Sequence, residues 1–329
     1  MKTNDFFSSS LSVAYETSSR HDRGVELSHL RTLAAVVDLG TFEAAADELH
    51  ITPSAVSQRI RALESSCGRV VVRRSTPVAA TPDGAVLLRL ARQVELLAAE
   101  ADAELRGLAP GPGDTDGSGP ATSRTPLPVA VNADSLATWF APVLSEAARW
   151  DDVDLRLDVE DQDHSLDLLR AGAVLGAVTS EARPVAGCVA RRLGVMRYVP
   201  AAAPWLVERH GGDYATMPVL RFNAKDELQT TYLAARGAPA PSYRQVPASQ
   251  AFLEAVLAGL GWGLLPDHQL ARPLREGRLV ALPGEPVDVP LFWHRWRLAS
   301  TRLDRLTGAV LRAAASLTPL SSELSSADA

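Results

Sequence analysis

Small polar and basic side chains recur along one predicted helix near the start of the chain. The stretch 53–64 reads as a helix because Pro53 suits a first helical turn and Val56, Ile60 and Leu63 recur at helical spacing. The outward side chains carry hydroxyl, amide and guanidinium groups, which can bond base edges and phosphates in a major groove. The candidate DNA contacts on this helix are Pro53, Ser54, Ser57, Gln58, Arg59 and Arg61.

The neighbouring segments predict the small domain that would hold this helix. A helix precedes it over 41–49, joined by a tight turn at Ile51, and residues 30–37 predict an earlier helix with an apolar face. After Cys67-Gly68, residues 69–82 read as strand, turn and strand, with Arg73 and Arg74 at the tip. An ordinary helical hairpin with a solvated charged face is the alternative for the helical part alone.

Charge is distributed unevenly along the 329 residues, whose net charge is −6. Between Ile51 and Thr76 there are five arginines and one glutamate, a local net charge of +4. A basic patch on an acidic protein indicates one surface that faces phosphate. We therefore expect Arg59 and Arg61 to meet phosphates, and Arg73 or Arg74 to reach the backbone or minor groove.

Residues 27–107 resemble the winged helix-turn-helix and linker helix of a LysR-type transcriptional regulator. The matching positions are Ala45-Ala46, Ser54-Ala55-Val56-Ser57, Ile60, Leu63-Glu64, Arg73, Thr81 and Gly84. The resemblance implies a DNA-binding domain over 26–82, with double-stranded operator DNA and RNA polymerase as partners. The polar segment 1–25 is interpreted as a disordered tail, or as sequence upstream of the true start. Because it lacks the apolar run of a signal peptide, we expect a cytoplasmic protein.

A long amphipathic helix is predicted over 83–109. Its apolar positions recur every three or four residues: Leu87, Leu90, Val94, Leu97, Ala101, Leu105 and Leu108. This seam favours a dimerisation helix, although packing on its own domain is the alternative, and dimers or tetramers are what the family implies. The Gly- and Pro-rich segment 110–126 then predicts a flexible hinge.

Strands and helices alternate from 127 to 317, which predicts an α/β fold with a mostly parallel sheet. The family resemblance implies a two-subdomain effector-binding domain of the type 2 periplasmic-binding-protein form. We expect one subdomain from 127–198 with 267–317, the other from 199–266, and a disordered tail at 318–329. Ligands of such folds bind beyond the carboxyl ends of the strands.

Asn132-Ala133-Asp134-Ser135 lies at such a strand end, although plain capping of the next helix is the competing interpretation. The stretch 131–139 is similar to one LysR branch, the ArgP/LysG-type regulators of basic amino acid export, and 159–161, 176–179, 193–198 and 291–296 echo it. That resemblance implies lysine, arginine or histidine as effector and an activator of an exporter gene. The candidate effector contacts are Asn132, Asp134, Ser135, Asp161, Thr179, Phe222, Asn223 and Asp226.

A basic amino acid needs hydrogen-bond donors for its carboxylate and acidic side chains for its positively charged nitrogens. Ser135 and Thr179 are candidate donors to the carboxylate. The acids Asp134 and Asp161 are candidates for the nitrogens, with Asn223 and Asp226 from the opposite subdomain. The same fold with an organic acid as effector is the rival, and it would require Arg or Lys instead.

The sequence gives little support to the hypothesis that this protein is an enzyme. The chain has no G-x-G-x-x-G, G-x-x-x-x-G-K-S/T or G-x-S-x-G motif and no metal-spaced His/Cys cluster. We expect no cofactor, no metal site and no catalytic residue. The two cysteines, Cys67 and Cys188, read as structural thiols, and no segment is long and apolar enough to suggest a membrane partner.

Overall fold

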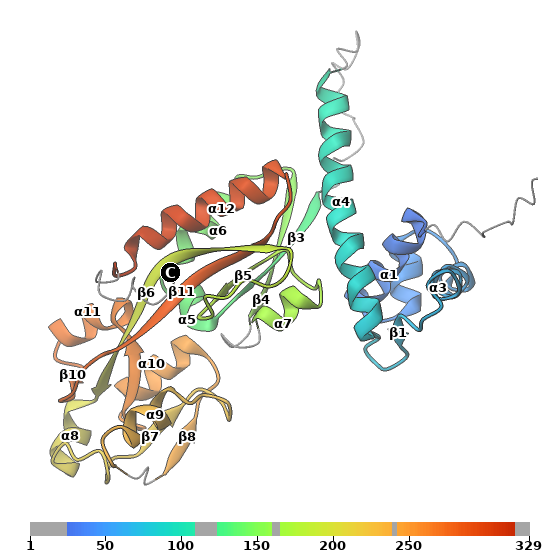
Figure 1. Ribbon diagram of the computed structural model, residues 1–329. Coiled ribbons are helices and arrows are strands. Elements are labelled where there is room, and N and C mark those ends of the chain that lie inside the picture. Colours follow the sequence, from blue (N-terminus) through green and yellow to red (C-terminus); the bar gives the residue numbers. More distant parts are fainter. Residues whose placement is uncertain (1–24, 109–123, 160–164, 239–241, 320–329) are drawn as a thin grey trace, which may run out of the picture. The chain divides into compact units, whose positions relative to one another are not determined.

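The computed structural model describes residues 25–108, 124–159, 165–238 and 242–319 (Figure 1). These fall into two compact units, one ending at Ala79 and the other beginning at Ala80, and each is described by itself. The tails predicted at 1–25 and 318–329 and the hinge predicted at 110–126 lie largely outside the described residues.

From residue 25 onward, the first unit contains three helices and a small wing. Its elements are α1 (Leu27–Leu39), α2 (Phe42–Glu48), α3 (Pro53–Cys67), β1 (Val72–Arg73) and β2 (Ala79–Ala80), the last spanning the boundary. The core comes from the predicted apolar positions, among which Leu33, Val56 and Ile60 are fully buried. The predicted helix-turn-helix is confirmed, with wing strands of only two residues each.

Local capping explains where the two helices of the motif begin. The Thr41 hydroxyl accepts a hydrogen bond from the Ala44 N–H at 3.1 Å, and the Thr52 hydroxyl accepts one from the Ala55 N–H at 3.2 Å. Each threonine satisfies an amide that the first helical turn leaves unpaired. The wing is tied to α3 because Glu64 accepts the Val71 N–H at 3.1 Å.

The second unit begins with the long helix α4 (Pro82–Leu108) and continues into an α/β domain. Its strands are β3 (Thr125–Val131), β4 (Val153–Val159), β5 (Gly176–Thr179), β6 (Cys188–Ala202), β7 (Val219–Arg221), β8 (Tyr243–Gln245), β9 (Gly263–Pro266), β10 (Val280–Ala281) and β11 (Val287–Trp296). Its other helices are α5 (Ala133–Ala137), α6 (Ala141–Ala147), α7 (Ser165–Arg170), α8 (Pro204–His210), α9 (Leu228–Ala234), α10 (Ser249–Leu257), α11 (Asp267–Arg275) and α12 (Thr301–Ala313), which a short 3-10 turn follows.

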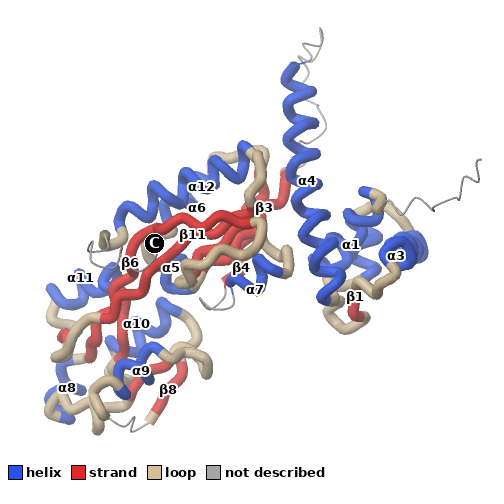
Figure 2. The backbone as a smooth tube through the Cα atoms, in the orientation of Figure 1, coloured by secondary structure: helices blue, strands red, loops and turns tan. Residues whose placement is uncertain are grey.

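The main sheet is mixed, which corrects the prediction of a mostly parallel one. The strand order is β10-β6-β11-β5-β3-β4, with β9 also on β6. Only β3 with β4 and β3 with β5 pair in parallel here, whereas β6 and β11 pair antiparallel with each of their neighbours in this sheet. Figure 2 shows β6 and β11 as two long strands that run side by side through the domain. The prediction failed because strand–helix alternation does not reveal such long connecting strands.

The division into subdomains also differs from the prediction. We expected the chain to return to the first subdomain near Pro266. Instead, Leu270 of α11 and Leu279 pack in one buried cluster with Leu220 and Leu265 of the second subdomain. The chain therefore returns later, along β11, because the apolar face of α11 completes the second core.

The larger core extends through both subdomains, and in the first it fills the space between the sheet and α12. Trp293 of β11 is fully buried, and its indole N–H donates to the Thr307 hydroxyl at 3.2 Å. Gly176 of β5 makes room for this ring, since a Cβ there would lie 2.4 Å from it. Among the described residues no helix is apolar and long enough to cross a membrane, and no group of acids, histidines and cysteines could hold a metal ion.

Candidate functional site

One candidate surface lies on α3 in the first unit. Ser54, Gln58 and Arg61 are exposed and Ser57 is half-buried. These four positions follow helical spacing and so share one stripe of the helix. Pro53 begins the helix, and the Ser54 hydroxyl lies 2.9 Å from that of Thr52.

Three predicted arginines lie off this stripe. Arg59 is half-buried and points about 100° around the helix from Gln58. Arg73 and Arg74 are exposed on the wing, where the Arg74 guanidinium stands 5.5 Å from the centre of the Phe42 ring. Ser54, Ser57 and Gln58 therefore offer polar groups suited to base edges, while Arg61 on the same stripe and the three arginines beside it offer cations suited to phosphates.

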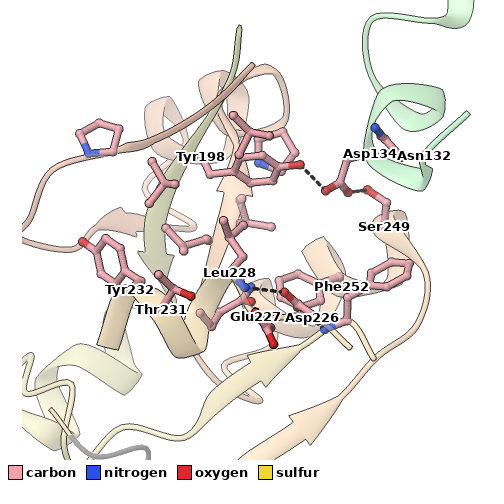
Figure 3. Close-up of a pocket in the computed structure, with 18 of the residues that line it drawn as sticks. Asn132, Asp134, Tyr198, Asp226, Glu227, Leu228, Thr231, Tyr232, Ser249 and Phe252 are labelled. Atoms are coloured by element: carbon pink, nitrogen blue, oxygen red, sulfur yellow. Dashed lines mark hydrogen bonds between the residues drawn. The ribbon is translucent and has the colours of Figure 1, made fainter. Parts of the chain in front are cut away.

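The second candidate site is a cavity of about 560 Å³ between the two subdomains of the second unit. The first subdomain contributes the turn before α5, and the second contributes α9, α10 and the loop before α9 (Figure 3). Tyr198 enters from β6, the strand that connects them. The cavity is large enough for a small metabolite.

Asp134 joins the two subdomains at this cavity. One carboxylate oxygen accepts a hydrogen bond from the Ser249 hydroxyl of α10 at 2.7 Å, and the other accepts one from the Tyr198 hydroxyl at 2.8 Å (Figure 3). Gln269 supports Ser249 by donating to its oxygen at 3.1 Å. Burial raises the pKa of Asp134, and the two hydroxyl bonds oppose that rise. A cationic ligand group beside it would restore the charged form.

A second buried acid lies on the opposite wall. Asp226 accepts the backbone N–H of Phe222 at 2.8 Å and that of Leu228 at 3.0 Å. The amide nitrogen of Gln229 lies 2.9 and 3.0 Å from the two carboxylate oxygens in the orientation that satisfies both groups. Burial raises the pKa of Asp226, the backbone bonds lower it, and the charge of Asp134 raises it further.

The lining of the cavity carries more acid than base. Its acidic side chains are Asp134, Asp226, Glu227 and Glu285, and its basic ones are Lys225 and Arg236. Arg236 is occupied locally, since its guanidinium lies 3.5 Å from the centre of the Tyr232 ring and donates to the Tyr232 carbonyl at 3.2 Å. The surplus of carboxylates favours a ligand with positive charge.

Asn132 supplies an unpaired donor to this lining. Its side-chain oxygen caps α5 by accepting the Ser135 N–H at 2.7 Å, so the predicted capping role is present. Its side-chain nitrogen is buried, and no hydrogen-bond partner for it is found among the described residues. A ligand carboxylate is an acceptor that this amide could serve.

The predicted effector contacts divide into three groups. Asn132, Asp134, Phe222 and Asp226 line the cavity. Three others do not line it, namely Ser135, whose hydroxyl is buried, Thr179, which accepts the Glu181 N–H at 3.2 Å, and Asn223, which accepts the Lys225 N–H at 2.7 Å. Asp161 lies outside the described residues.

Sequence reasoning missed Tyr198, Ser249 and Gln269. Tyr198 ended the stretch 193–198 that matched the LysR branch, which was a weak signal, and Ser249 lay within the strand–helix alternation predicted over 127–317. Gln269 had no such signal, because no sequence pattern indicates that α11 lies beside α10.

The two cysteines take no part in either candidate site. Cys67 is half-buried and Cys188 is buried, and both are free thiols. Burial raises the pKa of Cys188 to about 12, so this thiol stays protonated at neutral pH.

The chain matches two family models. Residues 27–85 match the bacterial regulatory helix-turn-helix protein of the lysR family, and residues 121–318 match the LysR substrate binding domain. The chain therefore belongs to the LysR family of transcriptional regulators, and the resemblance found in the sequence is confirmed.

Particular relatives narrow the comparison. The lysine export transcriptional regulatory protein LysG of Corynebacterium efficiens is 50% identical over 293 residues, which cover 87% of this chain and 97% of that protein. Full-length LysG of Corynebacterium glutamicum with bound effector Arg has 45% identity and a TM-score of 0.70, covering 89% of this chain and 100% of that one. ArgP of Mycobacterium tuberculosis has 44% identity and a TM-score of 0.75, covering 89% and 98%.

Proposed function

We propose that this protein regulates a gene for basic amino acid export and that arginine or lysine, bound in the interdomain cavity, is its effector. The observation that carries this proposal is the cavity of Asp134, Asp226, Glu227 and Glu285, which suits a ligand with more than one positive group. The similarity of the chain to LysG with bound Arg and to a lysine export regulator supports the same ligand class. The protein acts without catalysis or cofactor.

Within the cavity, each charged group of a basic amino acid can be given a complementary side chain of the lining. Asp134 accepts one ligand ammonium, and Asp226 with the neighbouring Glu227 faces the second cation from the other subdomain. The free amide nitrogen of Asn132 serves the ligand carboxylate. An effector that contacts both subdomains favours the arrangement in which its contacts are complete, and it shifts the equilibrium only by that difference in affinity.

The experiment that tests this function compares DNA footprints and bend angles on the operator with and without arginine or lysine. We expect the footprint and the bend to change at saturating effector. Identical footprints and bends in both conditions would remove the effector-driven switch. Calorimetry against an organic acid is the second arm, and tight binding of the acid with none of arginine, lysine or histidine would favour the rival effector class.

Operator DNA is bound through α3 and the wing. RNA polymerase is the partner that responds to the change in operator DNA, and the protein acts in the cytoplasm, where the chromosome lies. We expect Gln58→Ala to relax base preference at one operator position by roughly 1–3 kcal/mol, because an amide can read a base edge. Arg61→Ala should weaken all DNA about equally and reduce the salt dependence, since phosphate contacts carry no sequence information. Binding titrations on operator variants at several salt concentrations check both, and identical behaviour of the two variants contradicts this division.

The protein binds DNA as a dimer or tetramer joined through α4. Leu90, Leu97 and Leu105 of this helix are exposed at 41%, 39% and 66%, which leaves an apolar stripe for another chain. Sedimentation at micromolar concentration measures the assembly, and a monomer would contradict it.

Arginine binding should release protons and weaken as pH falls. The pKa of Asp134 and that of Asp226 are raised in the cavity, while a bound cation stabilises their charged forms and lowers both. Affinity therefore rises with pH between the lowered and the raised values, by up to about tenfold per pH unit for each carboxyl. Calorimetry in two buffers of different ionisation enthalpy counts the protons, and pH-independent binding without proton release would contradict this expectation.

A further inference from the structure

The middle of α4 is packed into the first effector subdomain as part of its core. Leu96 is 1% exposed and belongs to the buried cluster that contains Leu127 of β3 and Trp150. Residues of α4 and of the effector domain also fall in one compact unit. The helix expected to link two domains is therefore held by one of them.

Glu100 fixes α4 to the start of α12. One carboxylate oxygen accepts the Ser300 hydroxyl at 2.7 Å and the Arg302 N–H at 3.0 Å, and the other accepts the Thr301 N–H at 3.3 Å. The Thr301 hydroxyl adds a contact at 3.3 Å. A carboxylate satisfies the unpaired amides of a first helical turn and complements its positive end. This glutamate, 200 residues away in sequence, thus supplements the cap that Ser300 gives to its own helix.

Two arginines hold the same helix further toward its start. Arg89 donates to the Arg170 carbonyl at 3.0 Å, and its guanidinium lies 5.1 Å from the centre of the Trp296 ring. Arg92 donates to the Ala173 carbonyl. The backbones are also close, because a Cβ on Gly172 would lie 2.4 Å from the Arg89 Cα.

We propose that the junction of Arg89, Leu96 and Glu100 with the first subdomain transmits effector binding to the DNA-binding unit, and that the covalent connection after α4 does not. The inference rests on the proposed function for the existence of an effector response. A helix held at several points moves with the body that holds it. Any reorientation of the first subdomain is then passed along α4 to the chain of the first unit, which joins α4 at its start.

The contact itself is tested by amide hydrogen exchange on the full chain without effector. In Glu100→Ala, the amides of Thr301 and Arg302 should exchange at least about tenfold faster, because their acceptor is gone. Glu100→Gln keeps one acceptor oxygen and should fall between this variant and the wild type. Glu104→Ala, which removes an exposed acid one turn later, should leave both amides unchanged. Equal exchange in Glu100→Ala and wild type would overturn the junction.

Transmission is tested by the arginine-induced change in operator bend and footprint. In Glu100→Ala we expect arginine affinity within about twofold of wild type, operator affinity without arginine within about threefold, and at least half of the induced change lost. Insertion of Gly-Ser-Gly-Ser after Gly113 should leave the induced change intact. A full response in Glu100→Ala, or its loss on insertion, would overturn the proposal. If the wild type itself shows no arginine response, the proposed function fails, and the junction is then decided by hydrogen exchange alone.

Discussion

Replacing Asp134 with Asn should raise the dissociation constant for arginine at least about 30-fold, because one partner of a buried charge pair would be removed. The Asp134 carboxylate lies at the meeting point of the two subdomains, where Ser249 and Tyr198 both donate to it. These hydroxyls can donate or accept, so the amide can keep both bonds while losing the charge. The variant should therefore fold as the wild type does.

Calorimetry with arginine measures the loss, and the operator footprint should then stay unchanged at arginine concentrations that saturate the wild type. The control is Asp158→Asn, which removes an exposed carboxylate at the end of β4 that does not line the cavity. It should bind arginine normally. If Asp134→Asn binds arginine with full affinity, the ligand cation is held elsewhere, and our assignment of Asp134 is wrong.

Replacing Ile60 with Ala should strongly destabilise the DNA-binding unit while leaving arginine binding intact. Ile60 is fully buried among the three helices, and such a truncation costs roughly 2–5 kcal/mol. A domain of this size has a small margin of stability, so that cost is a large share of it. Operator affinity should fall at least about tenfold, and the first unit should melt at a lower temperature.

Scanning calorimetry and arginine titration of the same sample separate the two units. Arg61→Ala is the matched comparison on the same helix, since Arg61 is exposed. It should lose DNA affinity with no change in melting. Unchanged stability of Ile60→Ala would contradict the packing of α3, and a parallel loss of arginine affinity would show that the units do not fold separately.

The helix-turn-helix could be predicted because its signals are local. Thr52 and Pro53 mark the start of α3, and the spacing of Val56, Ile60 and Leu63 fixes its buried face within eight residues. Chain neighbours decide such features, so neither the sheet nor the effector domain had to be known. The family resemblance drew on the same short stretches.

The cavity was predicted only in part. Asp134 and Asn132 were found because they follow a strand, and Phe222 and Asp226 were among the candidates named from the expected second subdomain. The residues that hold Asp134 were not found. Ser249 is 115 positions away in sequence and Tyr198 is 64, and no local pattern pairs such distant side chains.

Sequence alone thus determined the family, the helix-turn-helix and two of the acids that line the cavity, Asp134 and Asp226, because each follows from residue type or from neighbours along the chain. Tertiary structure decided the rest. The antiparallel course of β6 and β11, the membership of α11 in the second core and the hold of Glu100 on α12 depend on surfaces that meet only after folding. Burial and geometry where these surfaces come into contact, rather than residue identity, decide which side chains interact.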